Sequence, residues 1–269
     1  MRMKRMLAVV ATLGLAMSLA SCGDDDGGGS DGKFVIGIKF DQPGLGFKNA
    51  DGSFSGFDVD MARYIAKGLG HDEGDIEFKE TVSANRETFL KDGTVDMILA
   101  TYSINDERKE VVDFAGPYYL AHQDLLVRAD DDSITGPDSL DGKKLCSVTG
   151  STSAQRVKDE YSEKVQLQEF DSYGKCVTAL LGEQIDAVTT DDIILAGFAN
   201  ANPGELRVVG EPFSDENYGV GLPKGSDDRD KINDLIEQSF EDGAWEKAFN
   251  DNLGESGYPL PAPPTVDRY

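Results

Sequence analysis

One stretch of the sequence carries residues whose types and spacing could bind a small anion. It spans residues 96–114 and reads DMILATYSINDERKEVVDF. We predict a short buried strand that ends at Ala100, followed by a polar turn containing Thr101 and Ser103. A guanidinium offers a planar fork that matches a carboxylate, and hydroxyls and free backbone N–H groups satisfy the remaining oxygen lone pairs. The stretch therefore indicates a site in which Arg108 binds a carboxylate.

A helix should begin directly after this turn and fix the position of Arg108. Asn105 is a favourable N-cap, and Asp106 and Glu107 lie in the first turn, where acidic side chains suit the helix dipole. The same residues also fit a simpler interpretation, in which Arg108 pairs with Asp106 or Glu110 on a solvated helix face. The stretch alone does not distinguish the two.

Polar residues also follow several other predicted strands. Ligands of open α/β sheets bind beyond the carboxyl ends of the strands, so residues just after a strand are candidates for a common site. The candidates are Lys39 after the first strand, Arg86 shortly after Glu80, Thr101 and Ser103 after Ala100, Ser151 and Thr152 after Val148, and Asp191 after Thr190. Ser151 and Thr152 also open a predicted helix, whose N–H groups and dipole favour an anion.

Taken by charge, these candidates suit an acidic amino acid. Arg108 and a helix N-terminus could bind one carboxylate, and Asp191 could bind an ammonium group. Lys39 and Arg86 could bind a second carboxylate. Charged hydrogen bonds contribute roughly 1.5–3 kcal/mol each, so several of them are compatible with micromolar affinity after the cost of association. Each residue also has a structural interpretation: a solvated strand end for Lys39, a surface ion pair for Arg86 and a helix cap for Asp191.

The order of predicted elements indicates two α/β lobes. Strand–helix units occur in two blocks, at residues 33–117 and 123–210, and the chain then returns to strand and helix. The second block reads as a βαβαβ unit, with strands and helices in turn at 144–148, 153–161, 165–170, 173–181 and 185–190. Such a unit calls for a parallel sheet with right-handed crossovers.

The N-terminus reads as an export signal followed by a tether. Residues 1–21 begin with basic residues and continue with an apolar run that is too short for a comfortable membrane span. The sequence LASC, which ends at Cys22, resembles the lipobox of bacterial lipoproteins, in which the cysteine becomes the lipidated N-terminus. Residues 23–32 contain no apolar side chain, so residues 22–32 predict a flexible tether.

Composition argues against several partners. The 269-residue chain has a net charge of −24, and loss of Arg2, Lys4 and Arg5 with the leader would make it −27. Nucleic acid is therefore not expected, because binding to its backbone requires a basic surface. His71 and His122 are the only histidines and lie far in sequence from the cysteines, so we expect neither a metal site nor a cofactor.

Two further cysteines, Cys146 and Cys176, would lie on the exported side of the membrane, where disulfides persist. A bridge between them would close a loop of about 30 residues and stabilise the fold by about 3 kcal/mol in the chain-entropy account. Two buried free thiols are the alternative.

Four ordered motifs resemble one known family. GFDVDMARYIAKGLG, at residues 56–70, is similar to the signature of family 3 extracellular solute-binding proteins of bacterial amino-acid importers. ATYSINDERKEVVDF, CSVTGSTSAQ and DAVTTDDIILAGF resemble further segments of that family. The resemblance covers residues 33 to about 254. It is strongest to glutamate-binding lipoproteins of actinobacterial importers, through KFDQPGLG, SANRETFL and CSVTGST.

The resemblance implies contacts with the main-chain groups of an amino acid. It implies that Arg108 and the backbone at Ser103 and Thr152 bind the α-carboxylate. It also implies that the Ala100 carbonyl, Ser103 and Asp191 bind the α-amino group.

The side-chain end of the site is implied to be basic. Lys39 stands where glutamine binders of the family have Asp, and acidic-amino-acid binders are basic both there and at the Arg86 position. Two departures from the family pattern matter. Thr101 stands where many members have Gly or Ser, and Asp191 is followed by Asp192, so the ammonium partner is ambiguous by one residue.

The implied fold class is α/β, a two-lobed periplasmic-binding-protein-like fold of type II. Each lobe would be a mostly parallel sheet flanked by helices, and two hinge segments would cross between the lobes. We expect lobe 1 at 33–117 and 218–254, lobe 2 at 123–211, hinge segments at 118–122 and 212–217, and a loose C-terminal tail at 255–269.

The expected function is that of a monomeric, lipid-anchored receptor outside the cell membrane, which closes over glutamate or aspartate and docks on the permease of an ABC importer. A binder of glutamine, asparagine or another polar amino acid is the alternative, followed by a dehydratase-like enzyme or a sensory domain on the same scaffold. Neither histidine lies at a predicted strand end, and no nucleophile motif is present, so we predict a binding protein and not an enzyme. A sensor would usually continue into an apolar helix, and none follows Tyr218.

Overall fold

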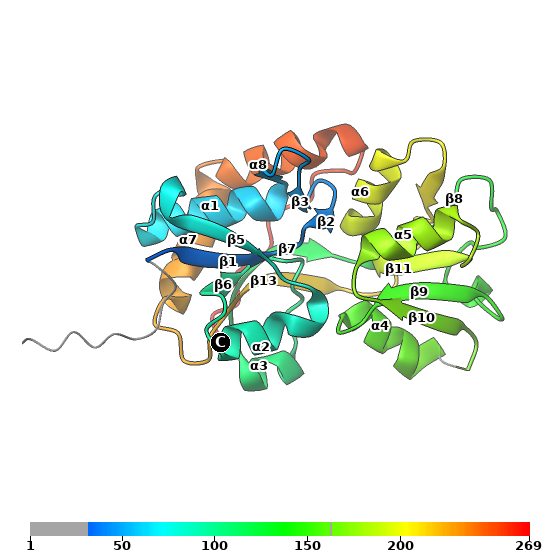
Figure 1. The fold of residues 1–269 in the computed structure, drawn as a ribbon, viewed down its shortest axis with the longest axis horizontal. Helices are drawn as coiled ribbons and strands as arrows, with labels where there is room; N and C mark the ends of the chain where they lie inside the picture. Colours follow the sequence, from blue (N-terminus) through cyan, green and yellow to red (C-terminus); the bar gives the residue numbers. More distant parts are fainter. Residues whose placement is uncertain (1–31, 162) are drawn as a thin grey trace, which may run out of the picture.

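The computed structural model describes residues 32–161 and 163–269, which form two lobes side by side (Figure 1). The predicted signal peptide, tether and lipidation site at Cys22 lie outside the described residues. Each lobe is built on a five-stranded sheet. A small sheet of three short strands, β2 (Asp41–Gln42), β3 (Gly46–Lys48) and β4 (Phe54–Ser55), precedes the first long helix.

The sheet of lobe 1 has the strand order β5-β1-β6-β13-β7. These strands are β1 (Phe34–Ile38), β5 (Ile76–Glu80), β6 (Met97–Ile98), β7 (Asp113–Ala121) and β13 (Glu216–Leu222). β1 is parallel to β5 and β6, whereas β13 is antiparallel to β6 and β7.

The sheet of lobe 2 has the strand order β10-β9-β11-β8-β12. These strands are β8 (Gln123–Arg128), β9 (Lys144–Val148), β10 (Gln166–Phe170), β11 (Ala187–Asp191) and β12 (Leu206–Val208). β9 is parallel to β10 and β11, which confirms the predicted βαβαβ unit. β8 runs antiparallel to β11 and β12. Each sheet is therefore mixed, because one strand runs opposite to the other four: β13 in lobe 1 and β8 in lobe 2. The predicted sheets with mostly parallel strands are confirmed.

Helices cover both faces of each sheet (Figure 1). In lobe 1 they are α1 (Phe57–Leu69), α2 (Arg86–Lys91), α3 (Asp106–Val111), α7 (Arg229–Glu241) and α8 (Ala244–Leu253). In lobe 2 they are α4 (Thr152–Arg156), α5 (Tyr173–Leu181) and α6 (Asp192–Ala201). α1 buries Phe57, Met61 and Ile65 at helical spacing. Gly56 precedes α1 with a φ of 125°, and a Cβ there would lie 2.0 Å from the Leu45 carbonyl oxygen, so only glycine fits.

Two strands carry the chain between the lobes (Figure 1). β7 leads through His122 into β8 of lobe 2, and β13 returns to the sheet of lobe 1. The two strands pair, with Tyr218 opposite Tyr119. The indole N–H of Trp245 in α8 donates to the Tyr118 carbonyl at 2.8 Å and so ties the crossing strand β7 to the helices of lobe 1.

The C-terminal residues 255–269 contact the rest of the protein, so the expectation of a loose tail is wrong. The Tyr269 hydroxyl accepts a hydrogen bond from a backbone N–H of β7 at 2.9 Å. Arg268 pairs with two carboxylates of α7, both at 2.7 Å. The Tyr258 hydroxyl donates to Asp192 of lobe 2 at 2.5 Å. Proline content suggested a loose tail, but it does not report these side-chain contacts.

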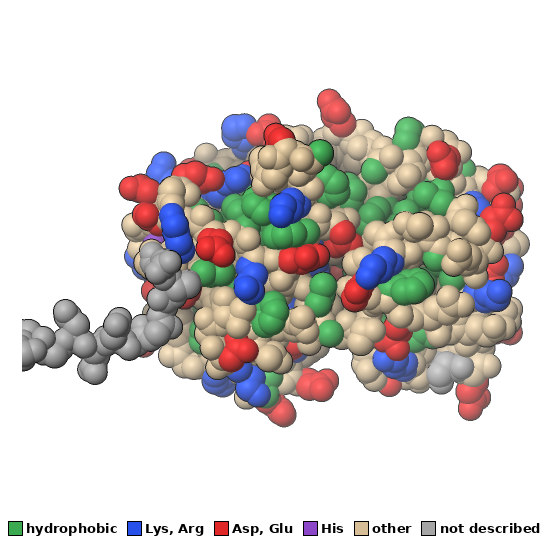
Figure 2. All heavy atoms as spheres, viewed as in Figure 1, with side chains coloured by type: hydrophobic (Ala, Val, Ile, Leu, Met, Phe, Trp, Pro, Cys, Tyr) green, Lys and Arg blue, Asp and Glu red, His purple; other side chains and the backbone are tan. Residues whose placement is uncertain are grey.

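Cys146 of β9 and Cys176 of α5 form a disulfide, which confirms the predicted pair. The bridge joins two neighbouring elements of lobe 2. Across residues 32–161 and 163–269, no helix is both long and apolar enough to cross a membrane. On the face seen in Figure 2, Lys and Arg side chains stand among acidic ones.

Candidate functional site

A small cavity lies between the lobes, where residues that follow strands of both sheets meet. Six of the nine predicted ligand-binding residues line it: Arg86, Thr101, Ser103, Ser151, Thr152 and Asp191. Four residues that the sequence did not suggest complete the lining: Ser83, Ser153, Tyr173 and Ile194. The remaining three predicted residues, Lys39, Ala100 and Arg108, contact residues of this lining. The structure therefore brings the predicted residues together.

Arg86 is buried in lobe 1, which excludes the surface ion pair considered from the sequence. It is 2% exposed, and its Nη1 donates to the carbonyls of Ala100 and Thr101, both at 3.2 Å. Its Nη2 donates to the Gly150 carbonyl of lobe 2 at 3.3 Å. The guanidinium lies 4.2 Å from the ring centroid of Tyr102. Burial lowers the pKa of Arg86 to about 10.

Lys39 is also buried, so it is not a solvated strand end. It is 4% exposed, and its Nζ donates to the Ser83 hydroxyl at 2.8 Å. Ser83 itself lines the cavity. Burial, and then the charge of Arg86, lower the pKa of Lys39 to about 7. Lys39 thus places an ammonium group one hydroxyl away from the cavity.

Arg108 is positioned by the helix that the sequence predicted. The Asn105 side chain accepts a hydrogen bond from the Arg108 N–H at 2.8 Å and caps α3. The Arg108 Nη1 donates to the Ser103 carbonyl at 2.7 Å, and its Nε lies 3.3 Å from Glu87. Neither acidic neighbour of the simpler interpretation is its partner. Its Nη2 donates to the Gly150 carbonyl at 3.0 Å.

Gly150 is a point where lobe 2 lies against lobe 1. Its carbonyl accepts from Arg86 and Arg108 of lobe 1. Its φ is +81°, and a Cβ there would lie 2.7 Å from the Ala84 Cα, so this approach requires glycine. The hydroxyls of Ser103 and Thr152 lie 3.4 Å apart across the same interface. The structure is therefore a closed arrangement of the two lobes.

The turn between β6 and α3 has an unusual backbone. Thr101 has a φ of 46°, which is rare for a β-branched residue. Its N–H donates to Asp58 at 2.9 Å, and its hydroxyl donates to the Ala100 carbonyl at 2.8 Å. The Ala100 carbonyl, predicted to bind an amino group, thus accepts from Thr101 and Arg86 in this structure. Asp58 was not suggested by the sequence.

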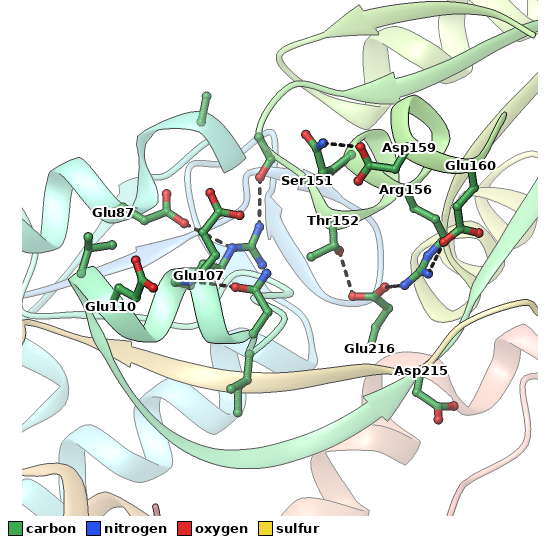
Figure 3. A pocket seen from close by; sticks show the side chains of 17 residues that line it. Glu87, Glu107, Glu110, Ser151, Thr152, Arg156, Asp159, Glu160, Asp215 and Glu216 are labelled. Carbon is green, nitrogen blue, oxygen red and sulfur yellow. Dashed lines mark hydrogen bonds and ion pairs between the residues drawn. The ribbon is translucent and has the colours of Figure 1, made fainter. Parts of the chain in front are cut away.

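The N-terminus of α4 presents Ser151 and Thr152 to the cavity. The Ser151 hydroxyl accepts from the Ala154 N–H at 2.9 Å and acts as the helix cap. The Thr152 hydroxyl donates to Glu216 of β13 at 2.8 Å. Arg156 of α4 lies 3.5 Å from the same carboxylate, and Figure 3 shows both side chains directed at it. Glu216 thus joins lobe 2 to a crossing strand.

A wider groove of about 720 Å³ borders the cavity (Figure 3). Arg108 and Arg156 line it together with seven acidic residues: Glu87, Glu107, Glu110, Asp159, Glu160, Asp215 and Glu216. The groove shares Ser151 and Thr152 with the cavity. The approach to the cavity on this side is therefore acidic.

Asp191 and Asp192 have different surroundings. Asp191 lines the cavity, is 3% exposed, and accepts from the Tyr218 hydroxyl at 2.5 Å and the Ser153 hydroxyl at 3.3 Å. Burial, and then the charge of Glu216, raise the pKa of Asp191 to about 8. Its side chain does not cap α6. Asp192 instead accepts hydrogen bonds from the Tyr258 hydroxyl and from the backbone N–H of His122, which joins β7 to β8.

Some of the missed residues carried a signal in the sequence. Tyr173 follows β10 by a short loop and opens α5, so the rule of strand carboxyl ends could have found it. Ser153 is one residue beyond the predicted pair at the start of α4. Ser83 follows β5 more closely than Arg86 does, so the same rule could have found it. Ile194 is apolar and lies within α6, so it carries no such signal.

Comparison with known proteins identifies the family. Residues 34–255 match the bacterial extracellular solute-binding proteins, family 3. Glutamate-binding protein GluB of Corynebacterium efficiens is 48% identical, over 93% of this chain and 91% of that protein. The chain belongs to this family. Family 3 proteins are solute-binding proteins, so the predicted class of binding protein rather than enzyme is confirmed, as is the resemblance to the glutamate-binding members.

Other family 3 relatives support the fold. The ABC transporter glutamine-binding protein GlnH of Bacillus subtilis is 38% identical, over 86% of this chain and 83% of that protein. A solved structure of an ancestral arginine-binding protein bound to glutamine superposes with a TM-score of 0.77 at 34% identity, covering 84% of this chain and all of that chain. The predicted two-lobed periplasmic-binding-protein fold of type II is therefore confirmed.

Proposed function

We propose that this family 3 protein captures an acidic amino acid, glutamate or aspartate, between its lobes and delivers it to the permease of an ABC importer. The hinge lies in residues 118–122 and 212–217, and opening there admits the ligand. Closure buries the ligand and presents a joint surface of both lobes to the permease.

The observation that carries the proposal is a set of buried charges without ionic partners. Lys39 and Arg86 belong to lobe 1 and Asp191 to lobe 2, and within residues 32–161 and 163–269 none of the three forms an ion pair. Buried charges are costly unless they are compensated. A ligand with one ammonium group and a distal carboxylate would compensate both signs. Glutamate and aspartate carry these groups.

The main-chain groups of the ligand are assigned to the remaining residues. The α-carboxylate binds the guanidinium of Arg108 and the backbone N–H groups of Ser103 and Thr152. The α-ammonium group binds Asp191 and the carbonyl of Ala100. Arg86 and Arg108 exchange part of their present hydrogen bonds to backbone carbonyls for bonds to the ligand, and a charged acceptor makes the stronger hydrogen bond.

The nearest alternative ligand is glutamine, because the glutamine-binding protein GlnH is 38% identical to this chain. The identity of 48% to a glutamate-binding protein and the basic side of the cavity favour the acidic ligand. A neutral amide would leave the charges of Lys39 and Arg86 uncompensated.

Isothermal titration of the soluble form that starts after Cys22 tests the ligand class. We expect micromolar or tighter binding of glutamate or aspartate and no binding of arginine. Lys39→Ala should weaken glutamate binding roughly 10- to 150-fold, the value of one charged hydrogen bond. The exposed lysine Lys48 of the same lobe provides the control variant, Lys48→Ala, which should bind normally. Tight glutamine or arginine binding that ignores Lys39→Ala would exclude the acidic assignment.

We further propose that Cys22 is lipidated and anchors the protein outside the cell membrane. The lipobox-like sequence before Cys22 supports this anchor. Cys22→Ala should move the protein from the membrane fraction to the medium and abolish labelling with palmitate. An unchanged distribution would argue against lipidation.

A further inference from the structure

Asp58 of α1 is a fully buried carboxylate with an unexpected environment. It is 0% exposed, and burial raises its pKa to about 6. No Lys, Arg or His of residues 32–161 and 163–269 lies within ion-pair distance of it. It does not line the cavity. A carboxylate in such a place is costly unless hydrogen bonds compensate it.

Two hydrogen bonds connect Asp58 to different parts of lobe 1. Its Oδ2 accepts from the Thr101 N–H at 2.9 Å, in the turn that borders the cavity. Its Oδ1 accepts from the Tyr118 hydroxyl at 2.8 Å, on the crossing strand β7. One carboxylate therefore joins α1, the cavity turn and the strand that leads to lobe 2.

The cavity turn, residues 100–103, needs support at Thr101. A positive φ costs a non-glycine residue on the order of 1–2 kcal/mol and persists only where contacts enforce it. The end of the turn is paired with β13. The Tyr102 carbonyl accepts from the Gly219 N–H at 2.9 Å, and the N–H of the next residue after the turn, Ile104, donates to the Asn217 carbonyl at 2.8 Å. The Thr101 N–H, in the first half, has Asp58 as its acceptor.

We propose that Asp58 is a positioning residue for ligand binding, which holds the Thr101 peptide so that the Ala100 carbonyl and Ser103 face the ligand. The inference rests on the proposed function, because it concerns the same cavity. Asp58 acts through the turn and does not touch the ligand itself.

Two substitutions separate hydrogen bonding from charge. Asp58→Ala removes both acceptors and should weaken glutamate binding at least tenfold. Asp58→Asn can accept from the Thr101 N–H with its oxygen and donate to the Tyr118 oxygen with its amide, so it should remain within about threefold of wild type. Should the alanine variant not fold, Asp58→Leu provides the same loss of acceptors without a cavity.

Amide hydrogen exchange at Thr101 gives a readout that needs no ligand. In unliganded Asp58→Ala the Thr101 amide should exchange at least tenfold faster than in wild type, and Asp58→Asn should restore the protection. Asp124 provides a matched control, because it is 2% exposed and accepts from backbone N–H groups in lobe 2. Asp124→Ala should lower stability but leave the Thr101 exchange rate and the affinity unchanged.

The outcomes distinguish this inference from the proposed function. Wild type that binds no acidic amino acid overturns the proposed function, and the exchange comparison still decides whether Asp58 holds the turn. An alanine or leucine variant with wild-type affinity and wild-type Thr101 exchange would overturn the inference. Equal loss of affinity in the alanine and asparagine variants would also overturn it, because charge rather than hydrogen bonding would then be responsible.

Discussion

Three residues of the candidate site carry charged groups that are buried from water. Lys39, Arg86 and Asp191 are each less than 5% exposed. Their pKa values move towards neutrality, because burial disfavours the charged form of each. The site therefore reduces the stability of the unliganded protein in exchange for affinity, as binding sites commonly do.

The substitution Asp191→Asn tests whether a buried charged group lowers stability and raises affinity. An acid whose pKa is about 8 in the folded protein, against about 4 when unfolded, makes folding less favourable as the pH rises between these values. Asparagine cannot ionise, so it removes this loss of stability, and its side-chain oxygen still accepts a hydrogen bond from Tyr218. We expect unliganded Asp191→Asn to be about 1–3 kcal/mol more stable than wild type at pH 8 by urea unfolding, and to lose glutamate binding at least 100-fold.

The neighbouring Asp192 provides the control for this change. It accepts hydrogen bonds from Tyr258 and does not line the cavity. Asp192→Asn should therefore lower stability and alter affinity less than about threefold. An Asp191→Asn variant that is less stable than wild type at pH 8, yet binds glutamate normally, would contradict the prediction.

Proton exchange on binding should change sign near neutral pH. In the closed structure without ligand, the pKa of Lys39 is about 7 and the pKa of Asp191 is about 8, and both groups become charged when the ligand binds. At pH 6, Lys39 is already protonated and Asp191 must lose a proton, so about one proton is released. At pH 8.5, Asp191 is mostly ionised and Lys39 must gain a proton, so somewhat less than one proton is taken up.

Titration calorimetry in buffers of different ionisation enthalpy measures this exchange. We expect release at pH 6, uptake at pH 8.5 and a crossover between about pH 7 and 8. The Lys39→Ala variant lacks the group that takes up a proton, so it should release protons at both pH values. This variant provides the internal control. A proton count of the same sign at both pH values in wild type would refute the assignment of the two groups.

At the scale of elements, short segments at strand ends build the site. The turn after β6 and the start of α4 face each other across the lobes, with Ser103 and Thr152 3.4 Å apart. Each segment is fixed by its own lobe: the turn by Asp58 and β13, and α4 by the Ser151 cap. In lobe 2 the disulfide joins β9, which leads to α4, to α5, which supplies Tyr173.

The disulfide should therefore contribute to stability more than to affinity. It closes a loop of 30 residues, for which the chain-entropy account gives about 3 kcal/mol. The double variant Cys146→Ala/Cys176→Ala should lose about this much free energy of unfolding in a denaturant titration. Glutamate affinity should change less than about threefold, because β9 stays paired with β10 and β11. A tenfold loss of affinity without loss of stability would contradict this.

At the scale of the whole molecule, the proposed function has an acidic protein bind an acidic ligand. The chain carries a net charge of −24, and the groove beside the cavity is lined by seven acidic residues and two arginines. Glutamate carries a net charge of −1, so its approach is opposed at long range even though the cavity itself is basic on one side. Salt screens such repulsion over a Debye length of about 10 Å at 0.1 M.

Association of glutamate should therefore become faster as salt is added. We expect the association rate constant to rise a few-fold between about 10 mM and 300 mM NaCl, opposite to electrostatic steering. Stopped-flow fluorescence of the single tryptophan, Trp245, which is tied to the crossing strand, can follow closure. Aspartate, with the same charge, should behave alike. A rate constant that falls with salt would show that the local basic groups dominate.

The sequence by itself predicted the elements, the family and most of the candidate site. Hydrophobic periodicity and turn residues predicted α1, the Asn105 cap and the βαβαβ unit of lobe 2, because these depend on neighbours along the chain. Residues at strand ends predicted Arg86, Ser103 and Asp191, because parallel strands deliver such residues to one edge.

Only the tertiary structure decided what the side chains contact. Asp58 supports Thr101 from 43 residues away, and Asp191 rather than Asp192 faces the cavity. The C-terminal residues 255–269 contact both lobes although their sequence suggested a loose tail. Each of these depends on the way that sheets and lobes are brought together. A local pattern cannot report which of two adjacent carboxylates lines the cavity, because burial and pairing belong to the assembled fold.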